Sequence, residues 1–141
     1  YGLVGSEMCI RDSNISRYKM DKKYEVIFWQ DINGYSESQE YIYKLKEKSL
    51  KSKDARIKLK KIVEYLDILE SYGTQVGEPF IKHLEGDLYE LRPIRDRFFF
   101  FYKQENKYII LNHFVKMTQK TPRREIEKAL KLMKDSIERN L

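Results

Sequence analysis

Three short apolar and aromatic runs follow one another between Leu84 and Pro122, and they constrain the fold more than any other part of the sequence. The runs are Leu88–Arg92, Phe98–Tyr102 and Tyr108–Leu111. Short runs rich in aromatic and β-branched residues, bounded by polar turn residues, are typical of strands. The polar stretch Glu105–Lys107 suits a hairpin loop. We therefore expect an antiparallel meander, with the continuously aromatic second run in a central strand that is covered on both faces.

Positive charge is concentrated in the same part of the chain. Between Arg92 and Arg124 there are nine basic residues and only two acidic ones, Asp96 and Glu105. The whole chain has 28 basic and 22 acidic residues and a net charge of +6, so the remainder is close to neutral. A basic end of a sheet favours binding to a polyanion, although a solvated lysine-rich surface would have the same composition.

The region before the meander predicts a first strand and two helices. Tyr24–Trp29 is rich in the residue types that favour strands. Helices are predicted at Glu37–Ser49 and Asp54–Tyr72, where apolar residues recur at helical spacing. Gly77–Phe80 is predicted to be a loop that leads back to the sheet through Ile81–Leu84. The helical stripes are expected to be Tyr41, Ile42 and Leu45, then Leu59, Ile62, Val63, Leu66 and Leu69.

Capping residues mark the predicted helix ends. Ser36 with Gln39 forms a capping-box pattern, and Asp54 is the expected N-cap of the second helix. Gly73 is expected to end that helix. The pair Thr121-Pro122 predicts the start of a last helix, with threonine as N-cap and proline at the first helical position. The apolar stripe of this helix is Ile126, Ala129, Leu130, Met133 and Ile137.

These elements predict an α+β fold in which the meander and the N-terminal strand form a four-stranded sheet, with a two-helix hairpin and a C-terminal helix. At 141 residues the chain fits a single domain, expected at 20–141.

Residues 1–19 lack a helical or strand period and are expected to be a non-native or disordered leader. They contain the only cysteine, Cys9, so an internal disulfide and a zinc cluster are excluded. No apolar run approaches the roughly 18 residues that span a bilayer. We expect a cytoplasmic protein.

The sequence lacks a glycine-rich phosphate loop, a Gly-x-Ser-x-Gly motif, a paired-histidine metal motif and a catalytic cysteine. RNA is a substrate that needs none of these, because its own 2′-hydroxyl is a nucleophile. An enzyme must then orient that hydroxyl, stabilise the negative charge that develops on the phosphoryl group and move protons. Arginine and lysine side chains supply the charge stabilisation without a metal.

Two segments resemble a known family. G-D-L-Y-E-L-R-P at Gly86–Pro93 and N-H-F-V-K-M-T-Q-K-T-P at Asn112–Pro122, with Arg97 and the aromatic run between them, resemble the phage-derived, HigB-like branch of the RelE/ParE toxin superfamily. The resemblance covers roughly Lys22–Glu138. It implies the toxin of a type II toxin–antitoxin system, a metal-independent endoribonuclease that cuts messenger RNA on the ribosome without a cofactor. The implied partner is a helix-turn-helix antitoxin, and no membrane is involved.

The resemblance also implies roles for individual residues. Arg92 and Arg97 match positions that hold the phosphate and stabilise the transition state, and Lys116 and Lys120 match a basic pair that completes the concave face. A salt bridge of Arg97 with Asp96 or Glu90, and solvated lysines, are the alternatives. Arg123 is expected beside them at the strand ends, where it binds RNA.

His113 has an unperturbed pKa near neutrality, which favours a role in proton transfer, although packing against Phe114 or a strand-end hydrogen bond fits equally. Tyr89 and Tyr102 are candidates for stacking on a base or for moving a proton, with core packing as the alternative.

One departure from the family keeps other functions open. Several relatives place a tyrosine or histidine in their last segment for proton transfer, whereas neither residue type follows His113 here. A ParE-like inhibitor of DNA gyrase would have the same fold. An inactive module that binds RNA or the ribosome is the third alternative.

Overall fold

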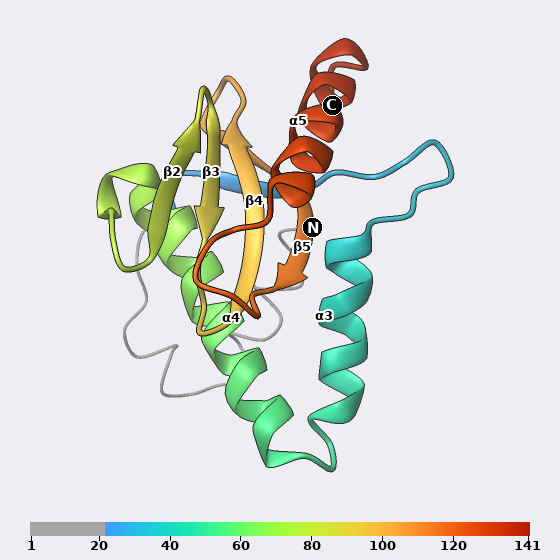
Figure 1. Ribbon diagram of the computed structural model, residues 1–141, viewed down its shortest axis with the longest axis vertical. Helices are drawn as coiled ribbons and strands as arrows, with labels where there is room; N and C mark the ends of the chain where they lie inside the picture. Colours follow the sequence, from blue (N-terminus) through green and yellow to red (C-terminus); the bar gives the residue numbers. More distant parts are fainter. Residues whose placement is uncertain (1–21) are drawn as a thin grey trace.

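The computed structural model describes residues 22–141 (Figure 1). The predictions about residues 1–19, including Cys9, lie outside the described residues. In chain order the elements are β1 (Glu25–Phe28), α3 (Glu37–Lys48), α4 (Lys53–Tyr72), the 3-10 helix η1 (Gly73–Val76), β2 (Ile81–Glu85), β3 (Leu88–Leu91), β4 (Asp96–Tyr102), β5 (Lys107–Val115) and α5 (Arg123–Glu138).

The strands form one sheet in the order β1-β5-β4-β3-β2. β1 pairs with β5 in parallel, and all other neighbours are antiparallel. The prediction of an α+β fold is confirmed, but the sheet has five strands rather than four. The additional strand is β2, in the segment predicted to be part of a connection. The sequence of β2 is Ile-Lys-His-Leu-Glu, and only its Ile81 side chain is fully buried. The strand therefore lacks the apolar run by which the other strands were predicted.

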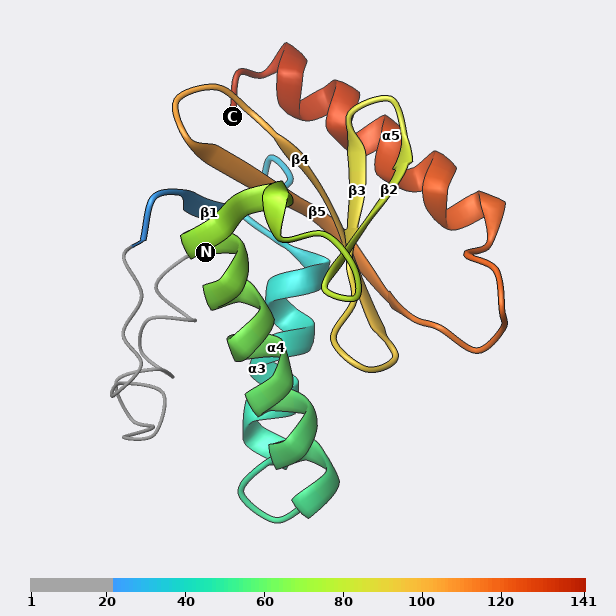
Figure 2. The same ribbon diagram turned by 90° about the vertical axis from the view of Figure 1, so that its left-hand side faces the viewer.

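Helices cover both faces of the sheet, as Figure 2 shows. α3 and α4 pack on one face, where their buried residues Ile42, Leu45, Ile62, Leu66 and Leu69 join Phe98 and Phe100. α5 packs on the opposite face, where Ala129 joins Phe99 and Phe101. β4 is the middle strand of the five and its four phenylalanines are buried, so the predicted central position of the aromatic run is confirmed.

An irregularity in β5 decides which face its last residues occupy. Phe100 lies opposite Ile110, but Phe98 lies opposite His113, so β5 contains one more residue than β4 in this interval. In a regular strand, side chains alternate between the two faces of the sheet. A bulge interrupts this alternation, so the residues after it point to the opposite face from the one expected. Ile110 faces α3 and α4, and after the bulge His113 faces the same side.

The helix ends agree only partly with the predicted caps. The Ser36 hydroxyl accepts a hydrogen bond from the Gln39 N–H at 3.2 Å, as expected. The N-cap of α4 is Ser52 instead of Asp54, because the serine hydroxyl accepts the Ala55 N–H. α5 begins at Arg123 with Pro122 at the N-cap, and no side chain caps it. The prediction that Ile137 belongs to the buried stripe of α5 is wrong, because this residue is 62% exposed.

Candidate nucleic-acid interface at the end of the sheet

Three basic residues of the predicted site lie together where β3 ends and β4 begins. Leu91 is opposite Phe98, so Arg92, the next residue, emerges beside Arg97. The N–H of Lys116, which follows β5, donates to the Arg95 carbonyl at 2.8 Å and keeps that lysine at the same edge. We call Arg92, Arg97 and Lys116, with the carboxylate of Glu90 between them, the cationic cluster.

The cationic cluster lies on the side of the sheet that α5 covers. Arg97 is opposite Phe114 and Glu90 is opposite Phe99, and both aromatic rings belong to the core on the α5 side. The Thr121 hydroxyl, in the loop before α5, donates to Glu90 Oε2 at 2.9 Å. The predicted N-cap threonine therefore connects the loop to the cluster instead of capping the helix.

Glu90 is the centre of the cationic cluster. Its side chain is fully buried, and Oε1 lies 3.6 Å from Arg92 Nε and 3.7 Å from Arg97 Nε. These distances allow ion pairing but exceed a good hydrogen bond. Among residues 22–141, none of these three atoms has a hydrogen-bond partner. Arg92 Nη1 also pairs with the exposed Glu78 Oε1 at 3.2 Å. With Lys116, the three cations still outnumber the two carboxylates, and the two Nε atoms without a hydrogen-bond partner among the described residues keep donor capacity that an anion is suited to use.

The Arg97 side chain is 9% exposed and is held by its surroundings. One terminal nitrogen, Nη1, donates to the carbonyls of Ile94 at 2.8 Å and Asp96 at 2.9 Å. Burial lowers the pKa of the Arg97 guanidinium, and the Glu90 carboxylate opposes that shift. The salt bridge considered for Arg97 is therefore present, but it is a buried pair with Glu90 rather than a surface one.

The field at Lys116 is positive in spite of Glu90. Burial lowers the pKa of the Lys116 ammonium, and the charges of Arg97, Arg92 and Lys82 lower it further, while the Glu90 carboxylate raises it. Like charges disfavour the protonated form, so the part of this shift that is not due to burial reflects repulsion among the cations. An anion bound here relieves that repulsion.

His113 does not join the cationic cluster. It follows the β5 bulge and faces α3, where its ring stacks on Tyr41 at 3.8 Å between centroids. Its Nε2 lies 2.8 Å from Asp96 Oδ1, and the Tyr41 hydroxyl donates to the same oxygen at 2.6 Å. Its partners are Asp96, Tyr41 and Phe98, not the considered Phe114. We call Tyr41, Asp96 and His113 the buried triad. It is separated from the cationic cluster by the sheet itself.

The remaining candidates divide between the two sides of the sheet. Lys120 is exposed in the loop before α5. Arg123 forms an ion pair with Glu85 at the β2 edge of the sheet, with nitrogen–oxygen distances of 2.5 and 3.5 Å. Tyr89 and Tyr102 lie on the α4 side, where Tyr89 stacks on Phe100 at 5.7 Å between centroids. Neither tyrosine lies at the cationic cluster.

Comparison with protein families was informative for most of the chain. Residues 48–134 match the family described as phage derived protein Gp49-like (DUF891). The chain belongs to this family, which is RelE-like and toxin-like. The matched range contains the whole cationic cluster but not Tyr41 of the buried triad. A search of curated proteins gave no match for this Gp49-like chain.

Two contributors to the Gp49-like site were not predicted. Glu90 was considered only as a salt-bridge partner, and its burial at the centre was missed. An acidic residue between Tyr89 and Leu91 in a strand is the available signal, because it must either face solvent or be paired. Lys82 lies on β2, the strand that was not predicted.

Within residues 22–141 no three His, Cys, Asp or Glu side chains are placed to hold a metal, and no helix is long and apolar enough to cross a membrane.

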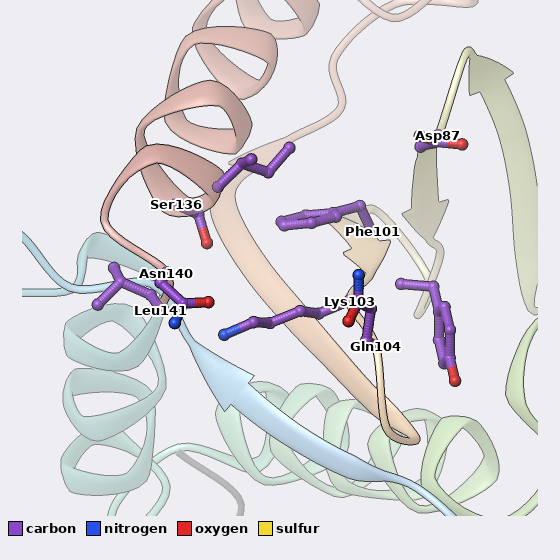
Figure 3. A pocket seen from close by; sticks show the side chains of 9 residues that line it. Asp87, Phe101, Lys103, Gln104, Ser136, Asn140 and Leu141 are labelled. Carbon is purple, nitrogen blue, oxygen red and sulfur yellow. The ribbon is translucent and has the colours of Figure 1, made fainter.

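A separate hollow of about 340 Å³ lies at the far end of β4, between that strand and the last turns of α5 (Figure 3). Phe101 forms part of its wall, and the Lys103 side chain extends across it. The Ser136 hydroxyl, which is buried and has no partner among the described residues, points into this hollow. The hollow is remote from the cationic cluster, which lies at the beginning of β4.

Proposed function

We propose that this Gp49-like chain is the toxin of a type II toxin–antitoxin system, HigB-like in activity, and that it cleaves messenger RNA held by a cytoplasmic ribosome. The observation that supports this most directly is the convergence of Arg92, Arg97 and Lys116 around one buried carboxylate. Family membership is compatible with a toxin whose partner is an antitoxin. In this proposal the antitoxin is the helix-turn-helix protein that the resemblance implies.

The proposed reaction uses the RNA as its own nucleophile and needs no cofactor. The 2′-hydroxyl loses its proton to solvent water and its oxygen forms a bond to phosphorus. The bond to the 5′-oxygen breaks, that oxygen takes up a proton, and a 2′,3′-cyclic phosphate and a 5′-hydroxyl result. The arginines stabilise the additional negative charge on the phosphoryl oxygens. Lys116 is the proposed proton donor to the departing 5′-oxygen, because its lowered pKa makes the ammonium a stronger acid. Glu90 is fully buried and acts as a positioning residue.

The position of His113 favours a second candidate, a module that binds RNA or the ribosome without cutting. The buried triad removes the one histidine of the predicted site from the cationic cluster. If Lys116 does not supply the proton, the cluster retains charge for binding but lacks a group for proton transfer.

Controlled expression followed by mapping of messenger RNA ends tests the proposal. We expect growth arrest and new transcript ends inside coding regions, and a reduction of cleavage by roughly 10²–10³-fold in Arg97→Ala, which removes a charge-stabilising donor. Arg124→Ala is the matched control, because that side chain is 85% exposed and lies outside the cluster. It is expected to cleave normally.

Three other outcomes would redirect the proposal. Intact transcripts together with co-sedimentation with ribosomes would establish the binding module. Intact transcripts with altered plasmid supercoiling would establish the ParE-like inhibition of gyrase. Cleavage that is equal in Arg97→Ala and Arg124→Ala would exclude the cationic cluster as the site.

A further inference from the structure

Tyr89 and Tyr102 were singled out for base stacking, but the structure brings them together in a different pocket. Tyr24 and Tyr108 complete its aromatic lining, and the volume is about 400 Å³. The pocket lies at the end of β4 that is opposite to the cationic cluster, and on the face that α4 covers. We call it the tyrosine pocket.

The tyrosine rings are fixed at steep angles to one another. The centroid of the Tyr108 ring lies 5.1 Å from that of Tyr24, with 59° between the planes, and 5.2 Å from that of Tyr102, with 67°. Two hydroxyls are already engaged, since Tyr108 accepts the Thr74 N–H at 3.1 Å and Tyr102 accepts the Asn106 N–H at 3.0 Å. Rings anchored in this way present differently oriented walls that need not reorganise when a ligand binds.

Gly73 shows how closely the backbone approaches these rings. A Cβ atom at this position would lie 2.7 Å from the Tyr108 hydroxyl oxygen and 2.9 Å from a ring carbon of Tyr24. The φ angle of +65° also favours glycine. The end of α4 therefore holds two walls of the pocket in place.

The charge of the tyrosine pocket is opposite to that of the cationic cluster. Asp87 is one of the residues that line the tyrosine pocket, and none of the described lining residues is lysine, arginine or histidine. This is a notable exclusion in a chain with 28 lysines and arginines. Tyrosine faces carry negative electrostatic potential and attract cations, most strongly where a carboxylate lies nearby.

We propose that the tyrosine pocket binds the guanidinium group of an arginine side chain from a protein partner. A planar guanidinium stacks on a tyrosine face and donates to a carboxylate, and both groups are present here. A nucleotide is the less suitable ligand, because its phosphate would meet Asp87 without a lining cation to balance it. This site goes beyond the proposed nuclease function and does not depend on it.

The two sites are separate enough to be occupied together. β4 has seven residues from Asp96 to Tyr102, which corresponds to roughly 20 Å at the rise of an antiparallel strand. The tyrosine pocket and the cationic cluster also lie on different faces. A partner that inserts an arginine here therefore leaves the cluster accessible.

Nuclear magnetic resonance of the full chain with labelled tyrosines tests the assignment. The probe is N-acetyl-arginine-methylamide, and N-acetyl-citrulline-methylamide is its neutral counterpart of nearly the same shape. We expect saturable shifts of a few tyrosine signals with the arginine probe, and binding about two- to fivefold weaker with citrulline, as the loss of an exposed cation–π contact implies. Uridine monophosphate is titrated in parallel as the nucleotide probe.

Three variants identify the pocket. Tyr102→Leu and Asp87→Asn should each weaken binding of the arginine probe, while Tyr102→Phe retains the aromatic face and should bind nearly as the parent does. Tyr43→Leu is the matched control, because Tyr43 on α3 is 43% exposed, close to the 45% of Tyr102, but does not line the pocket. Equal binding of arginine and citrulline, shifts caused by the nucleotide alone, or no effect of Tyr102→Leu would each overturn the proposal. RNA cleavage enters none of these readouts.

Discussion

The two sides of the sheet at the start of β4 place ionisable side chains in contrasting ways. On the α5 side, Arg92 and Arg97 share the buried Glu90 carboxylate at distances too long for good hydrogen bonds. On the α3 side, Asp96 is bonded by Tyr41 at 2.6 Å and by His113 at 2.8 Å. One side retains excess positive charge and unused donors, whereas the other satisfies its members with one another. The difference supports the proposal that the first side binds a ligand and that the second stabilises the fold.

The largest expected effect is on the cationic side. Glu90→Leu removes the buried carboxylate that lies between two arginines, and breaking a buried ion pair by removing one partner costs about 3–5 kcal/mol. We expect the free energy of unfolding in urea to fall by that amount. The double variant Glu90→Leu/Arg97→Met should recover part of the loss. A double variant less stable than Glu90→Leu would show that the arginine does not depend on this carboxylate.

On the α3 side, Asp96→Ala is expected to reduce stability by about 2–4 kcal/mol, because it leaves both the Tyr41 hydroxyl and the His113 ring nitrogen without their acceptor. Urea titration measures the loss. Cleavage per folded molecule should change much less than in Arg97→Ala. If the two variants lose cleavage equally, the buried triad takes part in the reaction and the contrast between the two sides fails.

A pH dependence is expected on the side covered by α4. Burial raises the pKa of the Glu70 carboxyl from 4.5 to about 7, against the opposing attraction of Lys22, which lies 3.2 Å away. The folded chain therefore holds this proton more tightly than the unfolded chain. This tighter proton binding adds to the free energy of unfolding, and its contribution is fully present below pH 4.5. The contribution is lost as the pH rises to 7, and the loss is at most about 3 kcal/mol.

Unfolding in urea at pH 4.5 and pH 8 measures this dependence. Glu70→Gln should lose less stability than the parent chain over that interval and should be the more stable of the two at pH 8. An identical pH dependence in both proteins would assign the effect to other groups.

The smallest expected effect separates hydrogen bonding from packing within the buried triad. Tyr41→Phe keeps the ring that stacks on His113 and removes only the hydroxyl, so a loss of about 1 kcal/mol is expected. Thermal and urea unfolding both report it. A loss as large as that of Asp96→Ala would mean that the single hydroxyl holds the triad together.

Local sequence patterns predicted most of the fold. The aromatic run gave the central strand, and spacings of three and four gave both helices before the meander, since burial on one face imposes these periods. The missed strand β2 has one fully buried side chain and little local signal. The four-stranded prediction failed there because an edge strand owes its pairing to its neighbour β3 rather than to its own composition.

The candidate site was less accessible to such patterns. The structure brings Arg92, Arg97 and Lys116 to the same edge of the sheet, while the catalytic roles assigned to them stay predictions. His113 was grouped with them because it lies between Arg97 and Lys116 in the sequence and because histidine as a residue type has an unperturbed pKa near neutrality. The one-residue bulge in β5 that turns it towards α3 has no distinctive local composition. Tyr89 and Tyr102 were assigned to RNA, whereas they face α4 and meet Asp87 in a separate pocket.

By itself, the sequence determined the helices α3, α4 and α5 and every described strand except β2, which side chains are apolar enough to be buried, and that positive charge gathers after Arg92. Only the tertiary structure decided on which side of the sheet each charged or aromatic group lies. The reason is physical: side chains alternate along a strand, so one inserted residue or one shift of register moves a group to the opposite face. Secondary structure depends on near neighbours, but a site depends on pairing between distant segments.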